Sequence, residues 1–491
     1  MMWFCLGTIL LAAAAVWALW WYLNRGVGSY QATGTSHELL ISELEKEAFS
    51  YQGPNRNPVI IVHGFLGASI FDEETGEELW GKFEPAGAPP EKCRRLAHPM
   101  AIGRSLGELS NSTGDRQLLD TAAVHLAGLN FQLPGYSRLI KVLEKIGYRR
   151  ENSAEGLRSI YEFHYDWRRD LVENARRLHR FILDTRQALE TAYRKINPAD
   201  RRDIQFDLVG HSMGGLISRY YLMFGEDDLP ADGSIAAPHW RPAAYVDKLF
   251  VVGTPNAGYL DTIVEMANGL RLAPGVTPHP AALIGTFPSC YFMLPEGPGG
   301  GLFDAADPEN PLDLFDIRTW QCRNLGLLNP ACDEALSHIL WEAKTRRERY
   351  EIALDHVTKC LARAKQFRAA LNQTVVKNPG KTELFLFAGD TTLTGIRATV
   401  AADGRVKVTE YGAGDGKVLT SSCRYDRSFE MPYFTSPIPW NKMFFINATH
   451  MGILDDASFI ANFSFQLLLN PTAAQRAEVL AHQEKADPVN G

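Results

Sequence analysis

No Cys-x-x-Cys pair occurs in the 491-residue sequence, and none of its seven cysteines belongs to a Cys/His cluster with the spacing of metal ligands. We therefore expect neither a metal nor a cofactor. Only Cys322 and Cys332 lie close enough in sequence to suggest a small disulfide loop. Buried free thiols are an equally good interpretation of these cysteines.

The sequence also lacks a stripe of basic residues, an internal repeat and a long low-complexity tract, and its formal net charge is −7. Proteins that bind nucleic acid usually present clustered Lys and Arg, so we do not expect a nucleic-acid partner. A chain of this length with 45% hydrophobic residues can form one large domain with insertions, or two domains. Its oligomeric state is left open.

Charged side chains are absent from residues 3–23. A helix of that length rises about 30 Å, which matches the hydrocarbon core of a bilayer. No Lys or Arg precedes the apolar run, and bulky aromatic residues follow the alanines at 12–15, unlike a cleavable signal peptide. We predict a single-pass membrane anchor at residues 1–25, with a cleaved signal peptide and secretion as the alternative. The side of the membrane on which the rest of the chain lies is open.

The motif Gly-His-Ser-Met-Gly at 210–214 stands between a short apolar run and a stretch with helical spacing. This order is typical of a nucleophile elbow, in which a strand turns sharply into a helix. Gly210 and Gly214 would allow the close backbone approach. Ser212 is then the predicted nucleophile, and the backbone N–H of Met213 is one predicted donor to a substrate oxyanion. An ordinary Gly-rich turn is the alternative.

A second motif follows the apolar run at 59–62, which is too short for a helix and predicts a strand buried on both faces. This run continues into His63-Gly64-Phe65. A loop after such a strand supplies the other oxyanion donor in α/β-hydrolases, here the backbone N–H of Phe65. A plain turn between strand and helix is the alternative.

The order of elements predicts an α/β fold of the α/β-hydrolase type with a mostly parallel sheet, because strands and helices alternate around the elbow.

Residues 72–132 are irregular and rich in Gly and Pro, which predicts a loop excursion. About 120 residues separate the strands predicted at 246–252 and 383–387, more than a crossover needs. We expect this insertion to be a cap or lid; a separate interaction module is the alternative. We predict an anchor at 1–25, a linker at 26–53 and a polar tail at 472–491. The hydrolase core lies in two parts, 54–258 and 381–471, with the insertion at 259–380 between them.

A serine nucleophile needs an imidazole that a carboxylate orients, and in this fold the order along the chain is Ser, acid, His. His450 lies between an apolar run of strand character and the last predicted helix, whereas His482 lies in the polar tail. His450 is therefore the predicted base. Asp390 and Asp415 are both possible acids, and the predicted topology permits either.

These motifs resemble the lecithin:cholesterol acyltransferase group, which includes lysosomal phospholipase A2 and phospholipid:diacylglycerol acyltransferase. The resemblance rests on PVIIVHGFLGAS at 58–69, LPGYSRLIKVLEKIGY at 133–148, YDWR at 165–168, GHSMGG at 210–215, VVGTP at 251–255, GDGKV at 414–418 and the TH-GIL pattern at 449–454. It implies that Asp415 is the triad acid, with Asp390 as runner-up, and that Phe65 is the first oxyanion donor.

Two departures from the family pattern concern the first loop. The family commonly has Pro where this chain has His63, and a small or polar residue where Phe65 stands. A backbone donor survives such a change, while the acyl pocket is altered. His63, Trp167 and Arg168 are candidates for lining the site, although an ion pair between Asp166 and Arg168 with Trp167 packed beside the site is the preferred interpretation of YDWR.

The expected function is that of a membrane-anchored serine acyl hydrolase or acyltransferase acting on lipid esters through an acyl-enzyme at Ser212. One alternative is a non-catalytic α/β-hydrolase scaffold that tethers a partner at the membrane. Another is an esterase for small soluble esters. The sequence leaves the acyl donor and acceptor open.

Overall fold

The structure, a computed structural model, describes residues 56–83, 88–119, 121–126, 129–153, 156–271, 278–373, 382–426, 436–468, 472 and 475, which belong to one compact unit. The predicted anchor and linker lie outside the described residues, as does the tail apart from residues 472 and 475. Within the described part, no helix is both long and apolar enough to span a bilayer.

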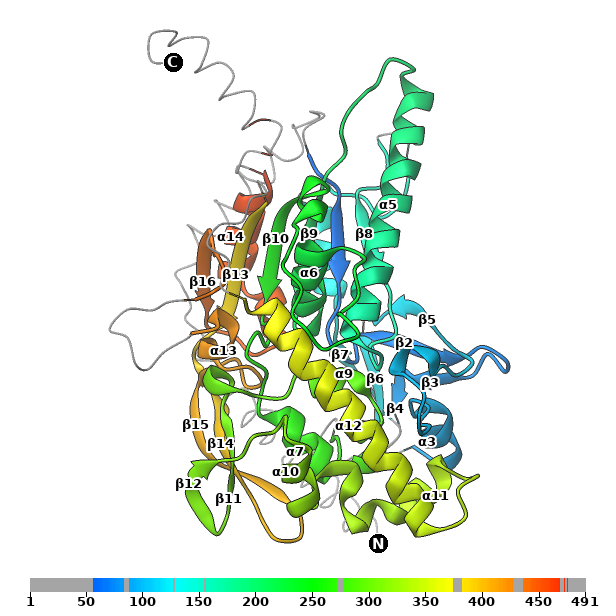
Figure 1. Cartoon of the computed structure of the whole chain (residues 1–491). Helices are drawn as coiled ribbons and strands as arrows, with labels where there is room; N and C mark the ends of the chain where they lie inside the picture. The colour runs from blue at the N-terminus through cyan, green and yellow to red at the C-terminus, as the bar shows by residue number, and fades with distance from the viewer. Residues whose placement is uncertain are drawn as a thin grey trace, which may run out of the picture. The chain divides into compact units, whose positions relative to one another are not determined.

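The centre of the described unit is a six-stranded sheet in which every neighbouring pair is parallel (Figure 1). The order across the sheet is β16 (Lys442–Ile446), β13 (Glu383–Gly389), β10 (Val246–Val252), β9 (Phe206–His211), β1 (Val59–Val62) and β8 (Ile160–Phe163). Every residue of β1, β9 and β10 is buried, as the continuous apolar runs predicted. The parallel sheet of the α/β-hydrolase fold is confirmed.

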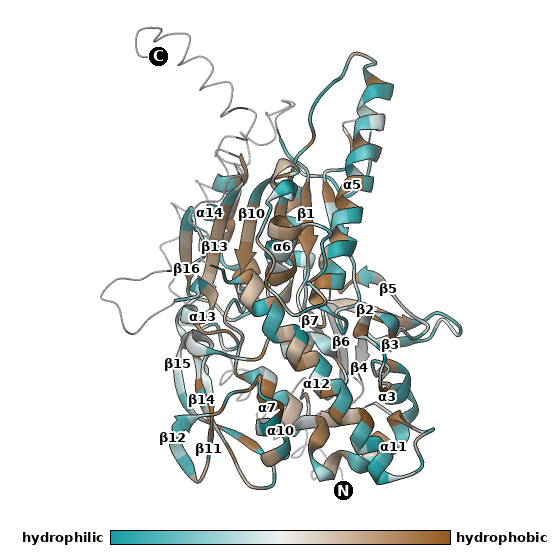
Figure 2. Ribbon diagram, in the orientation of Figure 1, coloured by the Kyte–Doolittle hydropathy of each residue, from teal (hydrophilic) through white to brown (hydrophobic). Residues whose placement is uncertain are grey.

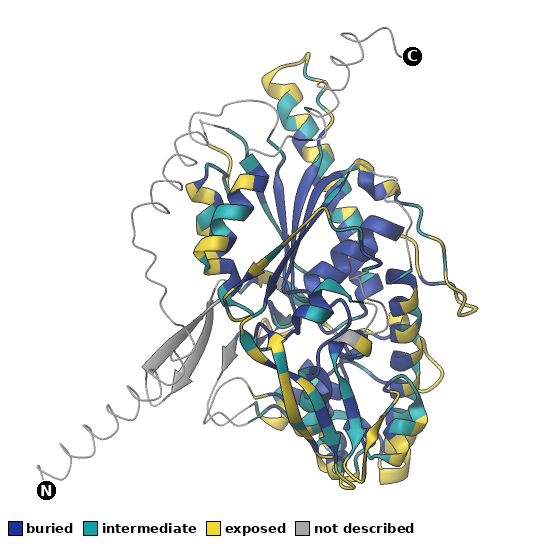
Figure 3. Ribbon diagram, turned by 90° about the vertical axis from the view of Figure 1, so that its left-hand side faces the viewer, coloured by how far each residue is buried: buried dark blue, intermediate teal, exposed yellow. Residues whose placement is uncertain are grey.

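Helices cover both faces of this sheet, and β1 shows how its residues divide between them. Ile60 and Val62 belong to the core cluster that contains α5 (Leu171–Ile196) and α6 (Met213–Phe224). Val59 and Ile61 belong to the cluster that contains α4 (Ser137–Lys145) and α14 (Ala457–Leu468). Because successive side chains of a strand point to opposite faces, one short run of apolar residues joins two hydrophobic layers. These strands are the apolar, buried centre in Figures 2 and 3.

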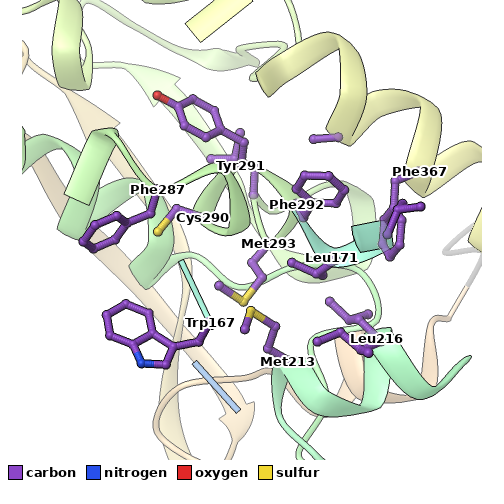
Figure 4. Close-up of a cluster of buried hydrophobic side chains, with 14 of the residues drawn as sticks. Trp167, Leu171, Met213, Leu216, Phe287, Cys290, Tyr291, Phe292, Met293 and Phe367 are labelled. Carbon is purple, nitrogen blue, oxygen red and sulfur yellow. The ribbon is translucent and has the colours of Figure 1, made fainter. Parts of the chain in front are cut away.

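The insertion between β10 and β13 is mainly helical in its described part. Its helices are α7 (Asp261–Asn268), α8 (Ala281–Gly285), α9 (Pro288–Phe292), α10 (Ile317–Cys322), α11 (Asp333–Ile339) and α12 (Arg346–Leu371). Figure 4 shows side chains of α9 and α12, among them Phe292 and Phe367, meeting Met213 and Leu216 of α6 in one buried cluster. The insertion therefore shares a hydrophobic core with the helix that begins at the elbow.

A second sheet joins the insertion to the segment after β13. Its order is β12 (Asp307–Pro311), β11 (Gly301–Asp304), β14 (Thr392–Val400) and β15 (Val406–Gly414). β14 and β15 form an antiparallel hairpin that turns between Val400 and Val406, and β11 pairs in parallel with β14. The chain leaves β15 directly into Asp415, so this sheet determines where that carboxylate lies.

The expectation of an irregular excursion at 72–132 was wrong. The region contains α3 (Pro90–Leu96) and two three-stranded sheets, β3-β2-β5 and β4-β6-β7. The strands are β2 (Ala68–Asp72), β3 (Glu78–Trp80), β4 (Lys82–Phe83), β5 (Thr113–Leu118), β6 (Thr121–Leu126) and β7 (Leu129–Pro134). β3 and β4 are too short to show a period in the sequence, and β2 pairs with β5 across about 40 residues, which local patterns cannot reveal.

The suggested disulfide between Cys322 and Cys332 is absent. Both are free thiols, the first exposed and the second buried. Burial raises the pKa of the Cys332 thiol to about 11, so this group is an unreactive part of the core at neutral pH.

Candidate active site

Ser212 stands alone between the end of β9 and the start of α6, with φ 53° and ψ −126°. A positive φ is costly for a residue with a Cβ, on the order of 1–3 kcal/mol. The flanking glycines make the turn possible. A Cβ on Gly210 would lie 2.7 Å from the Cα of Gly215, and one on Gly214 would lie 2.1 Å from the carbonyl oxygen of Val62. The predicted elbow therefore has the geometry that its glycines indicated.

A cavity of about 340 Å³ opens at Ser212. Its wall includes His450 from the loop after β16, the turn after β1 with Phe65 and aliphatic Leu66, and further aromatic side chains: Trp80, Tyr136, His211 and Tyr259. Ser212 and His450, which are 238 positions apart in the sequence, thus lie on one cavity. A mostly apolar concave site with a few polar groups at one place is typical of a small-molecule or lipid-chain site.

His450 is oriented by Asp415. Its Nδ1–H donates to Asp415 Oδ2 at 2.7 Å, and its backbone N–H donates to the Asp415 carbonyl at 2.8 Å. Asp415 is fully buried, and its Oδ1 accepts from the backbone N–H groups of Lys417 and Val418 at 2.9 and 2.7 Å. Because a carboxylate only accepts, Nδ1 of His450 carries a hydrogen, and in the uncharged imidazole Nε2 then has the lone pair.

Glycines on two neighbouring strands make room for this pair. A Cβ on Gly389 would lie 2.5 Å from the Asp415 Cβ. Gly253, which follows β10 with φ 56°, would place a Cβ 3.3 Å from both the Asp415 carboxylate and the His450 ring. The ends of β10 and β13 are thus shaped around the His450–Asp415 hydrogen bond.

Asp390 lies just beyond the end of β13, where its backbone N–H donates to the Ile446 carbonyl at 3.3 Å. The side chain that bonds to His450 is Asp415. Of the two acids that the predicted topology permitted, the structure therefore brings Asp415 to the imidazole.

Phe65 lies in the turn after β1, and Met213 directly follows Ser212. Phe65 follows β1 in a tight turn, closed by the Gly67 N–H donating to the Gly64 carbonyl at 3.1 Å. A Cβ on Gly64 would lie 2.8 Å from the Ser212 Cβ, so this turn abuts the serine. Met213 is the first residue of α6, where backbone N–H groups have no partner within the helix and the helix dipole is positive.

His63, Trp167 and Arg168 lie behind the cavity and are not among the residues that line it. His63 stacks on Tyr165 with ring centroids 3.9 Å apart, and burial lowers its pKa to about 3. Trp167 donates to the Ala68 carbonyl at 2.9 Å and meets the Phe65 ring edge-on. Arg168 is buried and forms the expected ion pair with Asp166. Trp167 thus supports the turn that carries Phe65, and Arg168 supports the surrounding fold.

The sequence motifs did not single out Tyr136 and His211, which both line the cavity. Their signals were nevertheless present, since His211 is the second residue of the elbow motif and Tyr136 lies in the LPGYS stretch. Lys417 was also missed. It follows the triad-acid candidate, lines the cavity and bonds to Asp261 and Glu265 of α7 at 2.8 and 3.0 Å.

No group of three or more His, Cys, Asp or Glu side chains able to hold a metal ion occurs among the described residues.

Residues 121–309 match the family described as lecithin:cholesterol acyltransferase, which confirms the resemblance carried by the motifs. No curated protein matches the sequence. Among solved structures, the crystal structure of the Tle4-Tli4 complex aligns with a TM-score of 0.51 and 13% identity, covering 84% of this chain and 98% of that chain.

Two bacterial structures align less closely. The Bacillus licheniformis lipase BlEst2 in its mature form aligns with a TM-score of 0.31 and 13% identity, covering 85% of this chain and 94% of that chain. EstA from Clostridium botulinum aligns with a TM-score of 0.30 and 14% identity, covering 88% and 97%. At 13% identity, the likeness to the Tle4-Tli4 complex structure concerns the fold alone.

Proposed function

We propose that this chain, whose residues 121–309 match the lecithin:cholesterol acyltransferase family, is a serine acyl hydrolase or acyltransferase that acts on lipid esters through an acyl-enzyme at Ser212. The observation that carries the proposal is the hydrogen bond between His450 and buried Asp415 on the cavity into which the strained elbow places Ser212.

In the proposed reaction, the Ser212 hydroxyl attacks the ester carbonyl carbon and gives its proton to His450 Nε2. The carbonyl oxygen becomes an oxyanion that accepts from the backbone N–H groups of Phe65 and Met213. The C–O bond to the leaving alcohol then breaks, and His450 returns the proton to that alcohol. Asp415 holds the imidazole in the required tautomer and stabilises its charged form.

The acyl group is then on Ser212 until a second nucleophile removes it. Water yields a free acid, and an alcohol yields a new ester. The apolar and aromatic wall made by Phe65, Leu66, Trp80 and Tyr259 supports an acyl chain as the group that occupies the cavity.

We also propose that residues 1–25 anchor the protein in a membrane, which would place the site near a supply of lipid esters. The support is the uncharged stretch at 3–23. A cleaved signal peptide followed by secretion is the alternative.

Labelling with a fluorophosphonate tests the proposed nucleophile. We expect covalent labelling of the wild type and loss of labelling in Ser212→Ala, because the probe reacts with an activated serine. Ser218→Ala is the matched control. Its hydroxyl, six residues along on α6, is buried and donates to the Gly214 carbonyl, so labelling should persist.

Absence of labelling in folded wild-type protein would favour the non-catalytic scaffold. Mass spectrometry of the protein after exposure to a lipid mixture would give the mass of the acyl group on Ser212 and so identify the donor chain. A small-ester esterase would instead show no increase in rate when a substrate passes from monomers to aggregates.

A further inference from the structure

Two buried side chains connect the turn that carries Phe65 to the loop that carries His450. The Gly64 N–H donates to the Tyr136 hydroxyl oxygen at 2.6 Å, and that hydroxyl lies 2.9 Å from His211 Nδ1. His211 Nε2 lies 3.2 Å from the backbone carbonyl oxygen of His450. This Tyr136–His211 bridge passes through the cavity wall, next to Ser212.

The hydrogen bonds of the bridge run in a single direction. The His450 carbonyl can only accept, so His211 Nε2 must carry a hydrogen. Burial lowers the pKa of His211 to about 3, so at neutral pH its ring is uncharged and its other nitrogen has no hydrogen. Nδ1 therefore accepts from the Tyr136 hydroxyl, whose oxygen accepts in turn from the Gly64 N–H.

The bridge ends on the two groups that have to be held relative to Ser212. At one end, Gly64 is the residue before Phe65. At the other, the backbone N–H and Nδ1–H of His450 both bond to Asp415. The rings of His211 and His450 pack against each other, with centroids 4.9 Å apart. Misplacing a reacting group by about 1 Å can cost a hundredfold in rate.

We propose that Tyr136 and His211 are positioning residues that set the oxyanion turn and the His450 loop at a fixed separation across Ser212. The proposal rests on the proposed function. It assigns these two cavity-wall residues a role that their hydrogen bonds perform: the bridge acts on the backbone of Gly64 and of His450, and through them on the donor and the base.

Tyr136→Phe tests the bridge because it removes one hydroxyl and little volume. We expect kcat for a chromogenic ester, counted per titrated active serine, to fall about ten- to hundredfold. The KM is expected to change by less than about twofold, since an interaction that acts on reacting groups appears in kcat. Tyr148→Phe is the matched control. That side chain is also buried, but its hydroxyl has no hydrogen-bond partner among the described residues, so its removal should leave kcat unchanged.

Substitutions of His211 approach the same bridge from its other end. A glutamine amide can place an N–H near the position of Nε2, whereas an asparagine amide is too short to reach the His450 carbonyl. We expect His211→Asn to lose about as much kcat as Tyr136→Phe and His211→Gln to retain more. Equal kcat in Tyr136→Phe and Tyr148→Phe, or a loss confined to KM, would overturn the proposal.

A nitrogen NMR measurement on the ring of His211 separates this proposal from the proposed function. The wild type should show a protonated Nε2 and an unprotonated Nδ1 at neutral pH, whatever the reaction. A protonated Nδ1 would contradict the bridge even in an active enzyme. Conversely, a protein could show the expected His211 tautomer while its Ser212 does not react. The Tyr136–His211 bridge would then be present, but the proposed function would be wrong.

Discussion

Ser212 is held in a backbone conformation that a residue with a Cβ rarely adopts, with φ 53°. The surrounding structure supplies the free energy for this strain, since β9 and α6 are both fully buried and continue directly from it. In return the hydroxyl stands at the tip of a sharp turn and on the cavity wall. Ser212, the proposed nucleophile, thus has a strained backbone that costs the folded protein stability.

Asp415 and Asp390 differ in what they contact, and this difference predicts opposite results for the same substitution. Asp415→Asn keeps the shape of the side chain but replaces the acceptor of the His450 proton, so His450 can adopt the wrong tautomer. We expect the rate of ester cleavage to fall by about a thousandfold or more. Asp390→Asn is the matched control and should change the rate by less than about threefold. Steady-state rates of the two variants check this, and near-wild-type activity of Asp415→Asn would exclude it as the triad acid.

At the scale of elements, the loops at the carboxyl ends of the parallel strands assemble the site. β1 ends before Phe65, β9 before Ser212, and β16 before the loop of His450. Parallel strands place all these ends on one edge of the sheet, which is where ligands bind in open α/β sheets. The hairpin β14–β15 contributes Asp415 from outside the central sheet.

The opposite ends of the strands carry a buried charged cluster instead. Asn57 donates to Asp207 at the start of β9 and to Asp247 at the start of β10, at 3.1 and 2.8 Å. Burial raises the pKa of Asp207 from 3.8 to about 7, an effect opposed by nearby Lys248 and reinforced by Asp247. Between these two values the folded protein binds more protons than the unfolded chain, so its free energy of unfolding falls as pH rises.

Asp207→Asn should therefore flatten the decline of stability with pH. In the wild type, the stability gained from protonated Asp207 is fully present below 3.8, the pKa of this carboxyl in the unfolded chain. It is lost as the pH rises through about 7, the pKa in the folded protein. Urea denaturation at about pH 5 and about pH 8 measures the difference in unfolding free energy for both proteins. The wild type should lose more stability than Asp207→Asn over that interval. An equal loss in both would mean that Asp207 is not the group responsible.

At the scale of the whole molecule, the insertion and the core are one hydrophobic unit. Phe367 of α12 stacks on Tyr220 of α6 with ring centroids 5.3 Å apart and meets Phe292 of α9 edge-on. Arg368 of α12 donates to the carbonyls of Asn256 and Leu294 at 3.0 and 2.9 Å. The insertion is thus fastened to the core beside the elbow by both apolar and polar contacts.

The proposed membrane anchor makes a prediction for the full chain. The wild type should sediment with membranes and resist extraction by high salt, because about 30 Å of apolar helix is not released by screening charges. A chain lacking residues 1–25 should become soluble and still be labelled by a fluorophosphonate. Recovery of the full-length chain in the soluble fraction, with residues 1–25 intact, would contradict the anchor. A mature protein that begins after that segment would instead support the cleaved signal peptide.

Elements with a local cause could be predicted from the amino-acid sequence. The elbow at Ser212, the strand before His63 and the parallel sheet follow from glycine spacing and short apolar runs, which act over a few residues. The family resemblance already favoured Asp415 over Asp390, and the fold shows how Asp415 reaches His450: the hairpin of the second sheet returns the chain to the imidazole. Only the tertiary structure revealed the short strands at 68–134 and the Tyr136–His211 bridge. Tyr136 and His211 are 75 residues apart, and β2 pairs with β5 across about 40 residues. A hydrogen bond between such distant residues leaves no period in the sequence.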